Sequence, residues 1–297
     1  MMRLENGRTV VLAGHGYSNT DPYLLLNDIE EGTQYRFAVR GKTFSIRKGT
    51  RRRCIGRFNL ETRERTVCPL GVALLADAKD AMCPACMEAT GFNPSFYYAD
   101  FVSPQQRMYN LTPHFVYLAY FSPQHVKAGI SSQTRGIERL LEQGARAARV
   151  VGRFEDAYAA RELEAMLCAQ PGVLETMRAS KKVELLAGTR YDVAEARSAL
   201  DAVVERLGLE GAEPVQDLSP YYFGGPSPDC HALQVPVGFD DVCGGLCTGM
   251  IGGCLVFEQG GMNYIVSVKE WESYEVELLE DEVACEYELE PQQIALF

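Results

Sequence analysis

The sequence contains no long hydrophobic run, and no stretch approaches the ~18–20 apolar residues that a membrane-spanning helix needs. Its first residues, MMRLENGRTVVLAGHG, lack the basic and then apolar segments that are typical of a secretory signal. Neither an internal repeat nor a low-complexity tract is present. With 46% hydrophobic and 23% charged residues among 297, the chain is predicted to be a soluble, cytoplasmic, globular protein of two or three domains without a membrane partner.

Basic side chains are scarce near the end of the sequence: residues 200–297 contain 2 basic and 19 acidic residues. The net charge of −11 argues against general nucleic-acid binding, because phosphate contacts require lysine and arginine. The stretch 40–65, however, contains 10 basic and only 2 acidic residues. It predicts a nucleic-acid partner. The alternative is that this stretch packs against the acidic C-terminal region, which is otherwise free to bind a protein partner.

Ten cysteines are present, and a cytoplasmic setting disfavours structural disulfides. Four of them, Cys54, Cys68, Cys83 and Cys86, are separated by 13, 14 and 2 residues. Four thiolates meet the tetrahedral preference of Zn²⁺, so the spacing predicts a structural zinc site. The alternatives are four buried thiols, or a redox pair in the Cys83–Cys86 motif.

The remaining cysteines are less informative. Cys243 and Cys247, with Cys230 and His231 nearby, have a spacing compatible with a second metal, whereas small buried thiols such as Cys254 are the plainer interpretation.

Hydrophobic patterns predict an α+β fold. Residues 8–14 alternate as a strand, and residues 35–47 alternate as two strands that are joined by a tight turn at Gly41–Lys42. Two strands and three helical segments, near 134–148, 155–169 and 193–207, follow, and Asp192 is expected to cap the last helix. We predict three regions, namely a β-rich region with the cysteine module (1–106), an α/β domain (107–212) and an acidic β-rich region (213–297) that pairs with 1–50.

The order of residues within 114–170 resembles the GIY-YIG nuclease domain. Phe115-Val116-Tyr117 stands where that family has Gly-Ile-Tyr, and Lys127-Ala128-Gly129 follows nine residues later, where it has Tyr-Ile-Gly. Arg139 falls on the following helical segment, and Glu164 of EDAYAARELEAML matches the metal-binding glutamate.

The segments HFVYLAYF, VKAGIS and ERLLEQGA are also similar to a bacterial family known as domain of unknown function 2797. That family has the CIG and CP cysteine motifs upstream and a GMIGGCLVF element near its end. This second likeness covers most of residues 40–275.

The nuclease resemblance implies a site for phosphodiester hydrolysis. Such a reaction needs a base or a water-positioning group, a cation for the developing charge and a metal. The resemblance assigns these roles to Tyr117, to Arg139, and to Mg²⁺ or Mn²⁺ held by Glu164. Plainer interpretations are a half-buried strand tyrosine and an arginine paired with Glu138 or Glu142 on its own helix.

One residue departs from the nuclease pattern. A lysine, Lys127, replaces the second tyrosine, and an ammonium group cannot share a proton with water as a phenol does. It can bind phosphate or, when desolvated, act as a base. The nearby His114 and His125 are expected to be turn or surface residues rather than bases.

Three functions therefore stay open from the sequence. The first is a metal-dependent nuclease or nucleic-acid-processing enzyme, and the second is a catalytically silent module that binds nucleic acid or protein. The third is a small-molecule enzyme that re-uses the same cleft, with Cys168 as its nucleophile. Whether the protein is an enzyme is left undecided.

Overall fold

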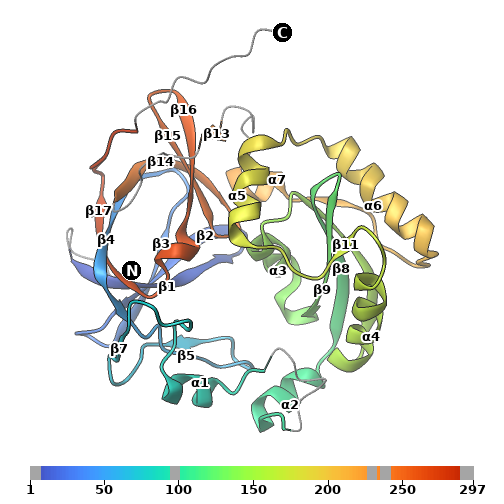
Figure 1. The fold of residues 1–297 in the computed structure, drawn as a ribbon, viewed down its shortest axis with the longest axis horizontal. Coiled ribbons are helices and arrows are strands. Elements are labelled where there is room, and N and C mark those ends of the chain that lie inside the picture. The colour runs from blue at the N-terminus through green and yellow to red at the C-terminus, as the bar shows by residue number, and fades with distance from the viewer. Residues whose placement is uncertain (1–7, 94–100, 226–232, 235–241, 288–297) are drawn as a thin grey trace.

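The computed structural model describes residues 8–93, 101–225, 233–234 and 242–287. They form an α+β structure with two main sheets and a small two-stranded sheet. Figure 1 shows the larger sheet curving around one side of the molecule and the second sheet, with its helices, on the other. Within the described residues, no helix is both long and apolar enough to cross a membrane.

The larger sheet joins strands from both ends of the described chain, in the order β13-β16-β15-β14-β4-β17-β1-β2-β3, with β7 added on β4. Strand β4 pairs antiparallel with both β14 and β17, and β17 also pairs antiparallel with β1. The strand bounds are β1 Thr9–Ser18, β2 Asp21–Asp28, β3 Thr33–Ala38, β4 Lys42–Arg53, β7 Ala73–Leu74, β13 Leu233–Gln234, β14 Val242–Ile251, β15 Cys254–Gln259, β16 Met262–Ser267 and β17 Tyr274–Glu280.

Glycines form two tight turns of the large sheet. Gly260 and Gly261, which join β15 to β16, have φ angles of 61° and 78°, a left-handed region that glycine adopts without strain. Gly41, before β4, has a φ of 76°. The strands on either side of Gly41, β3 and β4, agree with those that the alternating pattern predicts over residues 35–47.

The second sheet has the order β11-β9-β8-β10-β12. Its central strand β8 is buried at every position, because both faces are covered. Phe115, Tyr117, Ala119 and Phe121 pack into the core shared with the large sheet, whereas Val116, Leu118 and Tyr120 pack with residues of α4 and α6. The bounds are β8 His114–Ser122, β9 His125–Ser132, β10 Ala147–Phe154, β11 Val173–Leu174 and β12 Gln216–Asp217.

The helices lie mainly around the second sheet. Asp192 caps α6 by accepting hydrogen bonds from the N–H groups of Ala194 and Glu195 at 2.8 and 2.9 Å, as the sequence predicts. Asp156 caps α4 in the same way, through the N–H of Ala159. The bounds are α1 Pro84–Thr90, α2 Pro104–Asn110, α3 Gly136–Gln143, α4 Ala157–Cys168, α5 Ala179–Gly188, α6 Val193–Leu207 and α7 Ser219–Phe223, with 3₁₀ turns η1 Gln133–Arg135 and η3 Val268–Trp271.

The helix predicted near 134–148 is shorter than expected. Gly144 ends α3 in the left-handed conformation, and its N–H donates to the carbonyl of Leu141. Residues 147–154 then form β10, which pairs with β8. Helix-forming alanines and arginines masked this strand, because pairing with β8 outweighs their local preference.

Candidate functional site

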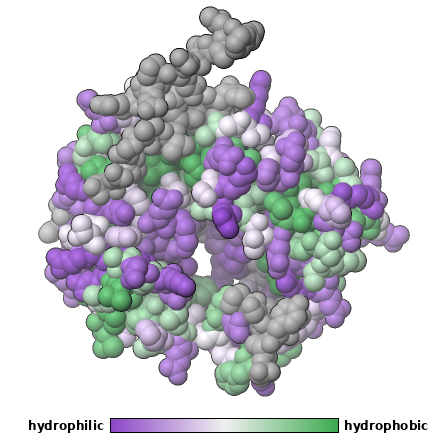
Figure 2. All heavy atoms as spheres, in the orientation of Figure 1, coloured by the Kyte–Doolittle hydropathy of each residue, from purple (hydrophilic) through white to green (hydrophobic). Residues whose placement is uncertain are grey.

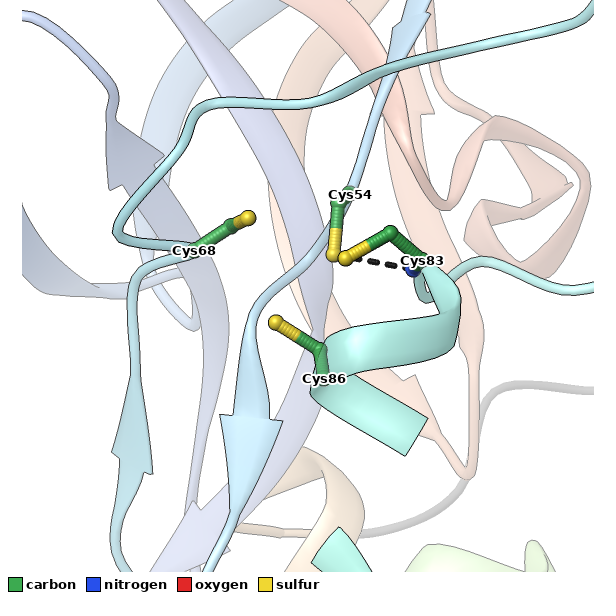
Figure 3. A group of neighbouring side chains, drawn as sticks. All are labelled: Cys54, Cys68, Cys83 and Cys86. Atoms are coloured by element: carbon green, nitrogen blue, oxygen red, sulfur yellow. Dashed lines mark hydrogen bonds between the residues drawn. The ribbon is translucent and has the colours of Figure 1, made fainter. Parts of the chain in front are cut away.

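Four cysteines gather in a module between the large sheet and α1. Cys54 follows β4, Cys83 is the N-cap of α1 and Cys86 lies in its first turn. Figure 3 shows their sulfur atoms, with that of Cys68, pointing toward a common centre. The four Sγ atoms lie within 4.8 Å of one another, and all four residues are buried. The predicted clustering of these cysteines is confirmed.

Backbone N–H groups orient the sulfur atoms. The Sγ of Cys54 accepts from the N–H of Cys83 at 3.1 Å and from that of Gly56 at 3.4 Å. Burial raises the pKa of Cys54. Burial also acts to raise the pKa of Cys68, but hydrogen bonds from Val72 and Leu70 and from neighbouring thiols outweigh it and lower that pKa to about 7.

This donor set fits a metal ion. Four sulfur ligands at ~2.3 Å from Zn²⁺ would lie roughly 3.8 Å apart, so the observed cluster closes around the ion with small side-chain movements. Sulfur donors and a closed, buried shell favour zinc over Mg²⁺ or Ca²⁺. The module can hold a metal ion, consistent with structural zinc.

The proposed second metal site has no comparable cluster among the described residues. Cys243 and Cys247 are buried in β14, and burial raises the pKa of Cys247 to about 12. Burial raises the pKa of Cys254, on β15, to about 12 as well. Cys230 and His231 lie outside the described residues.

A separate polar cavity of about 560 Å³ lies between the second sheet, α3 and α4. Tyr117 on β8, Lys127 on β9, Arg139 on α3 and Glu164 on α4 all line it. Four side chains that the nuclease resemblance singles out therefore share one cavity. The roles that the resemblance assigns to them stay predictions.

Gly129 makes room for two of these side chains. A β-carbon at this position would lie 2.6 Å from the hydroxyl of Tyr117 and 3.2 Å from the Nζ of Lys127, and both distances are below a normal contact. The absence of a side chain on Gly129 thus lets the phenol and the amine approach the same point. Gly129 pairs directly with Tyr117 across the sheet.

Burial changes the proton affinity of both groups. It raises the pKa of Tyr117, and the charge of Arg139 only partly offsets this. The Tyr117 hydroxyl is buried and has no hydrogen-bond partner in the described structure. Burial lowers the pKa of Lys127, and the charge of Arg139 lowers it further. The phenol is therefore a protonated donor at neutral pH, whereas the ammonium group of Lys127 loses its proton more easily than that of an exposed lysine.

Glu164 and not Glu162 reaches the cavity. Glu164 is 6% exposed, and its carboxylate is bonded by the guanidinium of Arg161. Arg161 also donates to Glu175 at 2.9 Å, and all three line the cavity. Glu162 is exposed on the same helix. Helical periodicity alone leaves these two glutamates equivalent.

Arg139 has only a distant acidic neighbour on its own helix. Its Nη1 lies 3.9 Å from the carboxylate of Glu142, which is bonded instead by Arg135. Glu138 pairs with Arg63 at 3.2 Å. The guanidinium of Arg139 is thus only weakly neutralised.

His114 was expected at a turn or on the surface, and this expectation is wrong. It is 1% exposed and lines the cavity. Its Nδ1 lies 2.7 Å from the carbonyl oxygen of Thr112, so this nitrogen carries the proton. Burial lowers the pKa of His114. His125, by contrast, is the first residue of β9, directly after the β8–β9 turn, with Nδ1 2.6 Å from the hydroxyl of Ser122.

The sequence analysis missed two charged residues of the cavity. Arg161 and Glu175 line it beside the predicted set, as does Arg135. The β-like run that begins at His114 could have indicated its burial, but nothing local distinguishes Arg161 and Glu175 from surface residues.

Cys168, the alternative nucleophile, is poorly suited to that role. Burial raises its pKa to about 11, and Glu164 and Glu175 contribute to the rise. The thiolate is the reactive form of cysteine, so this thiol is unreactive at neutral pH.

Much of the basic stretch 40–65 contacts acidic residues of β17. Arg47 lies opposite Glu277 and forms an ion pair with it, and Glu275 bonds Arg53 at 2.9 Å and lies 3.5 Å from Arg51. These contacts match the alternative in which the two charged regions neutralise one another. The nucleic-acid partner of this stretch stays a prediction.

The fold and the cysteine cluster define an α+β protein with four buried cysteines that can hold a metal ion. Residues 98–276, more than half of the chain, match the family described as Protein of unknown function (DUF2797), and the chain belongs to this family. Searches of the curated proteins and of the solved structures gave no match.

Proposed function

We propose that the protein is a divalent-metal-dependent nuclease or nucleic-acid-processing enzyme with a GIY-YIG-like core and a structural zinc module. The observation that carries this proposal is the single cavity lined by Tyr117, Lys127, Arg139 and Glu164. A tyrosine strand, a hairpin return, an arginine helix and a later glutamate helix follow one another in the order that the resemblance implies.

Each residue has a chemical task in this proposal. Tyr117, whose pKa is raised by burial, keeps its proton and donates a hydrogen bond that positions the attacking water. Lys127, whose pKa is lowered by burial, accepts a proton from that water or binds phosphate. Arg139 neutralises the charge that develops on the phosphate oxygens.

A hard divalent cation fits the two carboxylates of the cavity. Glu164 and Glu175 would hold Mg²⁺ or Mn²⁺, which retain most of their water ligands and need few from the protein. When bound, the ion supplies charge neutralisation at the phosphate. Arg161 bridges both carboxylates and has to release one of them.

Cleavage assays on matched variants test the proposal. Purified, metal-loaded protein is incubated with single- and double-stranded DNA and RNA, with and without Mg²⁺ or Mn²⁺. Glu164→Gln is expected to lower metal-dependent cleavage at least about 100-fold, as for other groups that stabilise a transition state. Glu162→Gln, an exposed change on the same helix, is the control and is expected to retain activity.

Circular dichroism and zinc content of both variants check that the fold is intact. Equal loss in the two variants, or full activity of Glu164→Gln, would contradict the assignment. If the folded wild-type protein cuts none of the substrates, a binding function replaces the enzyme.

One observation favours that second candidate, a catalytically silent binding module. Arg161 neutralises both cavity carboxylates, as a purely structural ion pair would. In that case the cavity binds a nucleic-acid phosphate through Arg139 and Lys127 without cutting it.

A further inference from the structure

A hollow runs through the centre of the molecule, between the large sheet, the cysteine module and α3. Figure 2 shows it from one face. It comprises two adjoining cavities of about 270 and 650 Å³. We call them the central cleft, and both are lined by Phe58, Arg63, Arg65, Arg135, Arg139 and Lys269.

The central cleft is continuous with the Tyr117 cavity. Arg135 and Arg139 line all three spaces, and Phe92 and Tyr109 are common to the cleft and the Tyr117 cavity. A ligand that occupies the cleft can therefore extend to Glu164.

The cleft is positively charged in a chain whose net charge is −11. Its lining contains six cationic side chains and three acidic ones, the latter being Asp80, Glu142 and Glu272. The cations come from separate elements, with Arg36 on β3, Arg65 on β6 (Arg65–Thr66, in the small two-stranded sheet) and Lys269 on η3. An excess of positive charge in a concave surface favours an anionic ligand.

Two of these cations have no carboxylate within 4 Å in the described structure. Arg65 donates to the carbonyl of Ala13 at 3.3 Å and lies 5.5 Å from the ring centroid of Phe58. Arg36 lies 5.1 Å from the ring centroid of Tyr23. Both are exposed to solvent, so their charges are available to a ligand.

Mutual repulsion among the cleft cations also favours an anionic ligand. Burial lowers the pKa of His15, at the cleft wall, to about 4, and Lys269, Arg65 and Lys182 all contribute. Burial and the charge of Arg65 also lower the pKa of Lys269. An anionic ligand would relieve this repulsion.

The larger cavity also offers apolar surface beside these cations. Phe92 is 50% exposed, and Phe58 and Tyr109 are partly buried. Aromatic rings next to arginines can stack on unpaired bases, which a duplex keeps within its own stack. The lining thus matches a single strand better than a duplex, which would present mainly its phosphates.

We propose that the central cleft binds single-stranded nucleic acid, its phosphates at Arg36, Arg65 and Lys269 and its bases on Phe58 and Phe92, and leads the strand past Arg135 and Arg139 to the Tyr117 cavity. This inference rests on the proposed function and deepens it by naming the substrate class. Binding can be measured separately from cleavage.

Fluorescence anisotropy of short labelled oligonucleotides tests the cleft, without Mg²⁺ or Mn²⁺ so that no cutting occurs. Single-stranded DNA, single-stranded RNA and the matching duplexes are compared at low and near-physiological salt. The double variant Arg36→Glu/Arg65→Glu is expected to weaken single-strand binding at least about tenfold and to reduce the salt dependence. Arg206→Glu, an exposed charge reversal on α6 and outside the cleft lining, is the control.

A second pair of variants, one test and one control, examines the aromatic residues of the cleft. Phe92→Ala is expected to weaken single-strand binding about fivefold to tenfold through lost base stacking. Phe101→Ala removes a ring that is 74% exposed and that is absent from the cleft lining, and it is expected to leave affinity unchanged.

Three results would overturn the cleft proposal: no single-strand binding at low salt, equal losses in Arg36→Glu/Arg65→Glu and Arg206→Glu, or duplex binding as tight as single-strand binding. A loss confined to Arg51→Glu, on β4 and outside the cleft lining, would also overturn it. Tight cleft-dependent binding without any cleavage would refute only the nuclease. Cleavage of duplex that the cleft variants leave unchanged would refute only the cleft.

Discussion

Strand β4 and the central cleft are both rich in arginine, yet their charges have different surroundings. On β4, Arg47 and Arg53 each form an ion pair with a glutamate of β17. In the cleft, Arg36 and Arg65 have no carboxylate within 4 Å among the described residues. The density of basic residues along a sequence therefore does not show which charges are available to a ligand. The packing of strands that are distant in the sequence, such as β4 and β17, determines which charges are available.

Disruption of the four-cysteine cluster is expected to have the largest effect, and to affect the cleft more than β4. Cys86→Ser should abolish metal binding and lower the free energy of unfolding by several kcal/mol, because metal binding and folding of such modules are coupled. Arg63 and Arg65 lie in the same module, so the cleft should lose one wall while the β4–β17 pairing persists.

Metal content by mass spectrometry, thermal melting and hydrogen exchange measure these outcomes. Cys168→Ser, outside the cluster, is the control. Full metal content in Cys86→Ser, or equal destabilisation of the control, would show that the cluster has no such role.

Acid should destabilise the cleft before it affects β4. The pKa of His15 is about 4 when folded and ~6.5 when unfolded, so the unfolded chain takes up the proton first. Stability is therefore lost as the pH falls from about 6.5 to about 4. Allowing for partial exposure, this loss should be roughly 1–2 kcal/mol.

Urea unfolding of the wild-type protein and His15→Gln, at neutral pH and near pH 4.5, measures this difference. The variant should lose less stability than the wild type on acidification. An identical loss in both proteins would mean that His15 is not held neutral by its cationic surroundings.

The smallest effects come from removing one charge in each region. Glu275→Gln leaves Arg51 and Arg53 without their acidic partner and should cost about 1 kcal/mol. Arg65→Gln relieves repulsion in the cleft and should change stability by less than about 0.5 kcal/mol, in the stabilising direction. Chemical denaturation of both variants at neutral pH checks the opposite signs, and destabilisation of similar size in both would remove the distinction.

Local patterns were sufficient for some parts of the structure. The cysteine cluster follows from the spacing around Cys83 and Cys86, and the hairpin of β8 and β9 follows from two consecutive β-like runs. The helix at α6 follows from its Asp192 cap. These features depend on residues close together in the sequence, or on a ligand chemistry that few other residues provide.

Other parts depend on partners far away in the chain. Strand β10 forms because β8 pairs with it, and α5 was not foreseen at all. His114 is buried because α2 and β8 place it in the cavity wall. The arginine charges of β4 are neutralised by glutamates of β17, which pairs with β4, and no local sequence pattern predicts that contact.

The pairing of β4 has a consequence for the order in which the molecule is completed. Its two sheet neighbours, β14 and β17, leave the ribosome long after it does, whereas the hairpin of β8 and β9 can form at once. In the nascent chain β4 therefore has two unpaired edges, and unpaired strand edges are prone to aggregation with other strands. Because like charges repel one another, the row of Arg47, Arg51 and Arg53 disfavours pairing of β4 with the same strand of another nascent chain. This protection is needed until β17, with Glu275 and Glu277, has been synthesised and pairs with β4.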